Sequence, residues 1–332
     1  MKSVKIRLAH FLLTLITITA TFVTASAQKD NDKGKDKVKD DPTANAVLWQ
    51  DGSVADRDLF LGPGGDEMKP DLSSVTFIEK DKSGHNEKFR IKDAGGRVWI
   101  AKLGREARPE IAANRILYAL GYKTEIQYLA PSITIPGKGT FDNVRLEARP
   151  DHVKRLDQWK WRDNPFTGTN ELQGLKIMMV FFLNWDLLDM QNKILRVKNG
   201  DVVEHDYIIS DLGATFGKVG NNNVPIFYRL GRKTDKPEVW SDAGFIKKVE
   251  NGRIQFDFKG KSHDIMDDIT VSQGRWLADR LLQITDKQLA DVFRAANYSP
   301  DESSVLINAF KARVAELDKA TAAAAPAAAP SN

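Results

Sequence analysis

The sequence lacks cysteine altogether, which excludes disulfide frameworks, thiolate zinc sites, iron–sulfur clusters and cysteine nucleophiles. It also lacks a strong excess of either charge. Lysine and arginine total 49 against 45 aspartates and glutamates, and three of the cations, Lys2, Lys5 and Arg7, stand within the first seven residues. Without these three the totals are 46 and 45, so the body of the chain gives no electrostatic reason to expect a nucleic-acid partner.

Several catalytic and membrane signatures are also missing. No G-x-S-x-G motif is present, so a serine hydrolase of the α/β type has no support. The five histidines show no paired spacing, which argues against a histidine zinc site. Beyond the first 27 residues the most apolar run, 177–183, is seven residues long, well short of the about 20 that a membrane-spanning helix needs.

The first 27 residues have the pattern of a signal peptide. The three cations precede an apolar stretch, Leu8–Val23, and Ala25-Ser26-Ala27 supplies small residues for a cleavage site. We therefore predict a signal peptide over 1–27, export to the periplasm or the extracellular space, and no membrane span after cleavage. An uncleaved membrane anchor is the alternative interpretation.

Composition divides the remainder of the chain into four parts. Residues 28–45 are mostly charged, with both signs interspersed and no apolar periodicity, which predicts a disordered linker. Residues 320–332 form an alanine- and proline-rich tail that we expect to be disordered. Between them, 46–150 show strand patterns and 151–319 show mostly helical patterns, so the predicted fold class is α+β.

Short alternating runs separated by turn residues predict strands in the first folded part. A helix with an apolar face follows the third strand, and Pro109 suits its first turn while Gly121 suits its C-terminal cap. The expected strands are 74–79, 88–92, 97–103, 127–129 and 144–147, and the expected helix is 109–120.

The second folded part is predicted to be helical, with one embedded hairpin whose turn is Asn199-Gly200. Asp286 and the segment Ser299–Asp301 are expected to supply helix N-caps. Trp159 and Trp161 are interpreted as partly buried loop anchors, with an aromatic binding surface as the alternative. The expected helices are 172–182, 276–284, 287–296 and 302–317, and the hairpin strands are 193–198 and 202–210.

A set of charged residues on these elements matches the needs of phosphoryl transfer, which takes a cation on the phosphates and a carboxylate that holds this cation. Lys102 lies among apolar residues on the third strand, where a lysine needs a partner or a ligand. Glu110, eight residues later, opens the following helix and can face that strand. Glu106 is the other candidate partner.

The second folded part supplies the remaining requirements, which are oxygen ligands for magnesium and a carboxylate that orients the acceptor hydroxyl. Asp186 follows a buried helix in Asn184-Trp185-Asp186. Asn192 comes just before the hairpin, and Asp211 stands at its far end, before Leu212-Gly213.

In this order the elements resemble the protein-kinase-like superfamily. The resemblance is closest to its atypical branches, the HipA-like, phosphatidylinositol-kinase-like and secreted-kinase types, and it covers about residues 74–217. It implies a two-lobed α+β fold, in which a small β-rich lobe with one helix precedes a larger helical lobe, and a nucleotide and magnesium or manganese bind in the cleft between them.

The resemblance also implies roles for individual residues. Lys102 would contact the phosphates of ATP or another nucleotide, and Glu110 would pair with Lys102. Asp186 would be the catalytic-loop aspartate, whereas Asn192 and Asp211 would ligate the metal ion.

Two further segments take roles from the same resemblance. The turn Ser83-Gly84-His85 would cover the phosphates, with Gly84 as its flexible residue. The segment Val144–Ala148, which includes Glu147, would be the hinge that contacts the base of the nucleotide.

The sequence departs from the family pattern at three of these places. The catalytic loop reads Asn184-Trp185-Asp186 where the family has His-Arg-Asp. The glycine-rich loop is reduced to Gly84. The family has its asparagine five residues after the catalytic aspartate, but that position here is Gln191, and Asn192 follows it. Gln191 or Asp189 is therefore an alternative to Asn192 as a metal ligand.

The leading hypothesis is an exported kinase-like phosphotransferase whose acceptor is a protein, a glycan or a small molecule. A catalytically silent kinase-like binding or scaffold protein of the cell envelope is the alternative, because nucleoside triphosphates are scarce outside the cytoplasm. Nucleotidyl transfer on the same scaffold is a third hypothesis.

Overall fold

The computed structural model describes residues 45–82, 86–220 and 231–324, all of which belong to one unit, Val38–Asn332. The predicted signal peptide, nearly all of the charged linker, and the turn with Gly84 lie outside the described residues. None of the helices in the described ranges has the length and apolarity that a membrane crossing requires.

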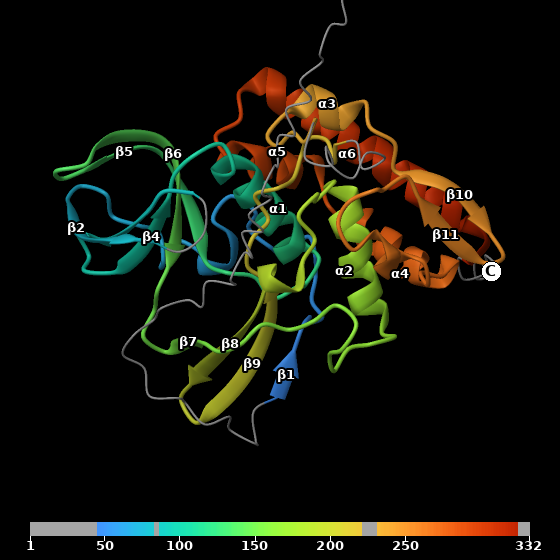
Figure 1. The fold of residues 1–332 in the computed structure, drawn as a ribbon, viewed down its shortest axis with the longest axis horizontal. Helices are drawn as coiled ribbons and strands as arrows, with labels where there is room; N and C mark the ends of the chain where they lie inside the picture. The colour runs from blue at the N-terminus through green and yellow to red at the C-terminus, as the bar shows by residue number, and fades with distance from the viewer. Residues whose placement is uncertain (1–44, 83–85, 221–230, 325–332) are drawn as a thin grey trace, which may run out of the picture. The chain divides into compact units, whose positions relative to one another are not determined.

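A five-stranded antiparallel sheet forms the first half of the fold, in the order β2-β3-β4-β6-β5 (Figure 1). All five strands were predicted, but the last two are much longer than expected. Pro131 obscured the length of β5, and the sheet tolerates it because β5 is an edge strand. The strands are β2 (Val75–Asp81), β3 (Lys88–Asp93), β4 (Val98–Lys102), β5 (Gln127–Ile135) and β6 (Gly139–Ala148).

The two faces of this sheet differ in polarity because side chains alternate along each strand. One face carries buried apolar side chains such as Trp99 and Leu146, on which Met68 and Leu72 pack. On the other face the register places Lys102 opposite Arg145 and Ile100 opposite Glu147. The predicted helix, α1 (Ala107–Ala119), covers this polar face of β5 and β6.

The opposite side of α1 joins the core of the helical half, where Ile111, Ile116 and Leu117 belong to the same apolar cluster as α2. At the centre of that cluster α2 is buried on every side, and Phe181 packs its ring against Trp240 and Phe310. The helices of this half are α2 (Asn170–Phe181), α3 (Pro237–Ser241), α4 (Val271–Leu281), α5 (Asp286–Ala295) and α6 (Pro300–Thr321).

A second sheet has the order β1-β9-β8-β7 and contains the predicted hairpin. Its turn lies one residue later than predicted. Asn199 is the last residue of β8 and pairs with Val202, so Gly200 and Asp201 form the turn, and Gly200 takes a left-handed conformation there (φ 61°). The strands are β1 (Asn45–Val47), β7 (Val153–Arg155), β8 (Asn192–Asn199) and β9 (Val202–Ile209). The hairpin of β10 (Ile246–Glu250) and β11 (Arg253–Phe256) was not predicted.

The predicted α+β organisation is confirmed, as a β-rich sheet with one helix followed by a mainly helical part. Other details were wrong. Helix α4 begins at Val271, whereas the predicted helix began at residue 276. Thr285, not Asp286, is the N-cap of α5, because its hydroxyl accepts the N–H of Gln288 in a capping box. The tail begins later than residue 320, since α6 continues to Thr321, whose hydroxyl donates to the carbonyl of Leu317 at 2.8 Å.

Candidate functional site

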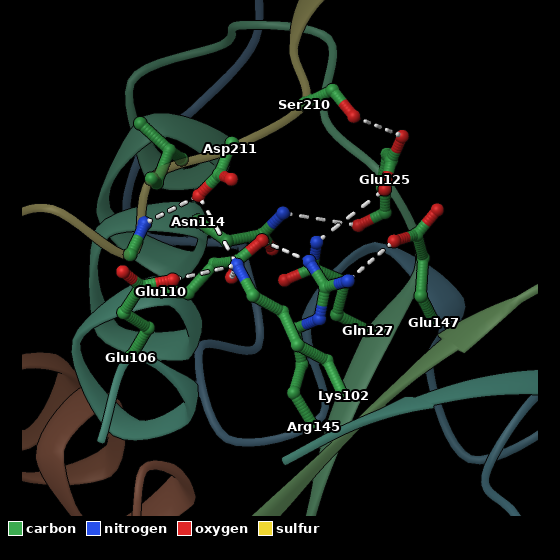
Figure 2. Close-up of polar contacts among 12 residues, drawn as sticks. Lys102, Glu106, Glu110, Asn114, Glu125, Gln127, Arg145, Glu147, Ser210 and Asp211 are labelled. Atoms are coloured by element: carbon green, nitrogen blue, oxygen red, sulfur yellow. Dashed lines mark hydrogen bonds and ion pairs between the residues drawn. The ribbon is translucent and has the colours of Figure 1, made fainter. Parts of the chain in front are cut away.

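Lys102 is the centre of a charged cluster at the end of β4 (Figure 2). Its ammonium lies 3.0 Å from Glu110 Oε2, 3.1 Å from Glu106 Oε2 and 3.2 Å from Asp211 Oδ1, and its side chain is buried. A short turn, residues 103–106, joins β4 to α1, so residues eight positions apart meet across this corner. The expected Lys102–Glu110 ion pair is therefore present, and the other candidate, Glu106, contacts the same ammonium.

Asp211 reaches the cluster from 109 positions further along the chain, just after β9. Its Oδ1 accepts the N–H of Gly213 at 3.1 Å, which fixes the carboxylate against the loop. Gly213 must be glycine, because a Cβ there would lie 2.6 Å from Glu106 Cβ. The side chains of Asp211 and Glu106 are 38% and 21% exposed, so these two carboxylates form the solvent-accessible edge of the cluster.

The pKa values follow from burial and from the opposite charges. Burial acts to lower the pKa of Lys102, but Glu110 and Asp211 outweigh it and the pKa is raised. Burial raises the pKa of Glu110 in spite of Arg145 and Lys102. Burial also acts to raise the pKa of Asp211, but Lys102, Arg145 and the Gly213 N–H hold it below its ordinary value. Asp211 is thus an anion at neutral pH.

The inner cluster contains more carboxylates than cations. Two cations, Lys102 and Arg145, face three carboxylates, those of Glu106, Glu110 and Asp211. The described residues contain no group of three His, Cys, Asp or Glu side chains that could hold a metal ion by itself. Magnesium usually binds through one or two carboxylates and completes its shell with substrate phosphates and water, so the exposed pair Glu106 and Asp211 fits such an ion.

Asn192, the first residue of β8, is fully buried opposite Ile209, two positions before Asp211. Its Nδ2 donates to the carbonyl of Trp159 at 3.0 Å. Its Oδ1 is buried and accepts no hydrogen bond among the described residues, which leaves one oxygen of the type that magnesium takes as a ligand.

The two alternatives to Asn192 have other partners. Gln191 donates its Nε2 to Asp186 Oδ2 at 2.7 Å. Asp189 accepts the N–H of Trp161 at 3.0 Å through its Oδ1 and so holds the loop before α2. Asn192 differs from both in that its side-chain oxygen is buried and accepts no hydrogen bond among the described residues.

Asp186 lies in the loop after α2, and both of its carboxylate oxygens have partners. Oδ2 accepts from Gln191, and Oδ1 forms an ion pair with Lys261. Two backbone hydrogen bonds tie this loop to the segment that follows Asp211: Trp185 N to Ala214 O at 3.2 Å, and Phe216 N to Phe182 O at 2.9 Å. The same loop pairing therefore fixes the positions of both aspartates.

Glu147, predicted at the hinge, is buried within a second charged cluster next to the first. It forms ion pairs with Arg145 at 2.7 Å and with Arg149 and Arg155. Arg155 stands on β7 of the second sheet and also contacts Glu125, so this cluster connects the two sheets. Burial, with a smaller contribution from Glu147, raises the pKa of Glu125 to about 7 although Arg155 opposes this.

The sequence pattern did not indicate that Arg145, Glu125 and Arg155 belong to the site. The only local signal was the alternation of charged and apolar residues at the end of β6, where Arg145 and Glu147 flank Leu146. This alternation puts both charges on the face that α1 covers, and the register of the sheet then brings Arg145 opposite Lys102.

Trp159 and Trp161 are both buried, and their ring centroids lie 4.8 Å apart in an edge-to-face contact. Trp159 Nε1 donates to the carbonyl of Ile208 at 2.9 Å. The two rings thus fix the loop before α2 to β9, and the aromatic binding surface considered as an alternative is excluded.

No protein-family model and no curated protein matches the chain. The Helicobacter pylori proinflammatory kinase CtkA matches in structure with 12% identity and a TM-score of 0.46, covering 77% of this chain and 98% of that chain. The Golgi casein kinase matches with 11% identity and a TM-score of 0.41, covering 77% and 74%. The structure of the Golgi casein kinase with Mn/ADP bound gives 9% identity and a TM-score of 0.40, covering 76% and 73%. All three matching structures are described as kinases.

Proposed function

We propose that this chain is a phosphotransferase that binds a nucleoside triphosphate with magnesium or manganese. The observation that carries the proposal is the buried ammonium of Lys102, which contacts Glu110 and Asp211 at 3.0 and 3.2 Å. Phosphoryl transfer is catalysed almost entirely by positioning and electrostatic stabilisation. A lysine held by a helix carboxylate, beside an exposed aspartate, is the arrangement that this chemistry requires.

Each residue of the inner cluster has a defined task in this proposal. Lys102, oriented by Glu110, binds phosphate oxygens of the nucleotide in place of one of its present carboxylate contacts. Asp211 and Glu106 hold the metal ion, and Asn192 Oδ1 is available as a further oxygen ligand. When bound, the metal ion neutralises charge that develops on the phosphate oxygens.

Asp186 orients the acceptor hydroxyl in the proposed reaction. Its carboxylate is 23% exposed and tied to the same loop pairing as Asp211, so an acceptor can reach it from solvent. The acceptor carries its hydroxyl on a protein, a glycan or a small molecule. Because the first 27 residues have the pattern of a signal peptide, we place the reaction in the periplasm or the extracellular space.

A catalytically silent nucleotide-binding module is the second candidate. The observation that favours it is Asp186, since Gln191 and Lys261 already occupy both of its oxygens. Such a module would bind nucleotide and metal at Lys102 and Asp211 without turnover. Release of ADP from ATP therefore separates the two candidates once binding is established.

The test is thermal melting of the purified protein with ATP and magnesium or manganese. Ligand at about 100 times its dissociation constant stabilises the folded state by about 2.7 kcal/mol, which raises the melting temperature by about 5 °C. Asp211→Ala should abolish the metal-dependent part of this rise. The matched control is Asp201→Ala, which removes an exposed aspartate from the turn of the same hairpin and should keep the full rise. No rise at millimolar nucleotide would exclude the proposed site.

A further inference from the structure

Lys261 is a cation that reaches Asp186 from 75 positions further along the chain. It lies in the turn after β11, and its ammonium forms an ion pair with Asp186 Oδ1. The two side chains are 28% and 23% exposed. Ion pairs that solvent can reach contribute only about 0–1 kcal/mol to stability, so holding the fold together does not account for this contact.

The segment that carries Lys261 is firmly anchored on both sides. Gly260 fits its turn because a Cβ there would lie 2.2 Å from the ring of Phe258. After the turn, Ile265 and Met266 are buried in the core of the helical half. Asp268 accepts from Gln173 on α2 at 3.2 Å. The ammonium of Lys261 is therefore presented to Asp186 by an ordered segment.

The sequence around Asp186 itself supplies no cation. The next basic residue is Lys193, beyond the three-residue turn 189–191 and already in β8. Within the part of the chain that the structure describes, Lys261 is the cation with a recorded contact to the Asp186 carboxylate. The other oxygen of Asp186 is fixed by Gln191, so the carboxylate keeps its orientation when the Lys261 contact breaks.

Phosphoryl transfer needs positive charge beside the group in transfer, because negative charge spreads over its equatorial oxygens. An acceptor hydroxyl that donates to Asp186 Oδ1 takes the place where Lys261 now binds. The phosphoryl group that this hydroxyl attacks then lies beside the displaced ammonium.

We propose that Lys261 is a second catalytic cation of the site and binds the phosphoryl group in transfer. The inference rests on the proposed function. In the transfer a bond forms between the acceptor oxygen and the terminal phosphorus, and the bond from that phosphorus to its bridging oxygen breaks. The hydroxyl proton passes to Asp186, and the nucleoside diphosphate leaves with the electron pair of the broken bond.

The test compares two probes by thermal melting and by titration: ADP with magnesium, and the same pair with aluminium fluoride, which mimics the phosphoryl group in transfer. Lys261→Met should leave the binding of ADP and magnesium unchanged. It should weaken the additional binding due to aluminium fluoride by about 10- to 100-fold, the effect expected for one charged hydrogen bond. Lys261→Arg should keep most of that additional binding.

Lys259→Met is the matched control, since it removes the same charge from an exposed position two residues away. It should behave as the wild type with both probes. The inference is overturned if aluminium fluoride adds nothing in the wild type, or if Lys261→Met binds it as tightly as or more tightly than the wild type. Failure of the proposed function would give a different result. ADP and magnesium would then bind neither the wild type nor Lys261→Met, or Asp211→Ala would not weaken their binding.

Discussion

Glu125→Gln should change the pH dependence of stability in a defined direction. Glu125 precedes β5, its side chain is 4% exposed, and it shares Arg155 with Glu147. Burial, with a smaller contribution from Glu147, raises the pKa of Glu125 from 4.5 to about 7 against the opposing charge of Arg155. A difference of this size between folded and unfolded chains corresponds to about 3 kcal/mol.

The sign follows from proton binding. Between about pH 4.5 and about pH 7 the folded chain holds a proton on Glu125 that the unfolded chain has lost. The free energy of unfolding should therefore fall by about 3 kcal/mol as the pH rises through this window. Glutamine resembles the protonated form, so Glu125→Gln removes this slope and should be more stable than the wild type above about pH 7.

The measurement is urea unfolding of both proteins at several pH values from about pH 5 to about pH 8. Glu147→Gln is the matched control. Burial acts to raise the pKa of Glu147, but Arg149, Arg155 and Arg145 outweigh it and hold it well below its ordinary value. Its replacement should therefore destabilise the protein near neutral pH, with the opposite sign. A constant difference between Glu125→Gln and wild type across the range would refute the reasoning.

Two further changes test the packing around the site. Glu110→Ala leaves the buried Lys102 without its helix partner and should lower the free energy of unfolding by about 3–5 kcal/mol in urea, whereas an unchanged value would show that Glu106 and Asp211 suffice. Gly121→Ala should lower the melting temperature much more than Gly137→Ala. Both positions have positive φ (101° and 71°), but a Cβ at Gly121 would also lie 2.4 Å from Trp49 Nε1, and Gly137 faces open space. An equal fall in melting temperature for both variants would show that backbone strain alone accounts for the loss of stability.

The inner part of the site could be predicted because its geometry is local. A strand, a short turn and a helix place residues eight positions apart side by side, so Lys102 and Glu110 could be paired from the sequence. The strong turn signal at Asn199-Gly200 likewise fixed the hairpin, and the hairpin brings its far end, with Asp211, back to its beginning. The contact between Asp211 and Lys102 at the end of β4 is not local, and only the order of the elements along the chain suggested it.

The second charged cluster could not be predicted because long-range register decides it. Arg155 meets Glu125 across 30 positions, and Ser210 Oγ donates to Glu125 Oε1 at 3.2 Å across 85. Whether Arg145 faces α1 depends on the pairing of β6 with β4, which a shift of one residue would reverse.

The same reason explains why Lys261 was not identified. Its contact with Asp186 depends on how the segment after β11 packs against α2, and no local pattern reports that packing. Asn192 shows an intermediate case. The predicted hairpin places Asn192, at the start of its first strand, near Asp211, at the end of its second. The complete burial of Asn192, and the hydrogen bond from its amide to the carbonyl of Trp159, depend on the tertiary structure.

The sheet face that α1 covers buries charged side chains, which stabilise the fold less than apolar packing would. Replacing a buried ion pair by well-packed apolar residues is often neutral or stabilising, by about 1–4 kcal/mol. The opposite face of the same sheet shows that this chain can pack such a surface, around Trp99 and Leu146. Stability alone therefore does not explain why Lys102 and Arg145 face the helix. The inner cluster also has more carboxylates than cations, and solvent reaches the carboxylates of Glu106 and Asp211. The proposed function accounts for this arrangement, because it takes a ligand with the complementary parts, which are a cation for Asp211 and Glu106 and an anion for Lys102. A nucleotide phosphate bound with magnesium or manganese has both.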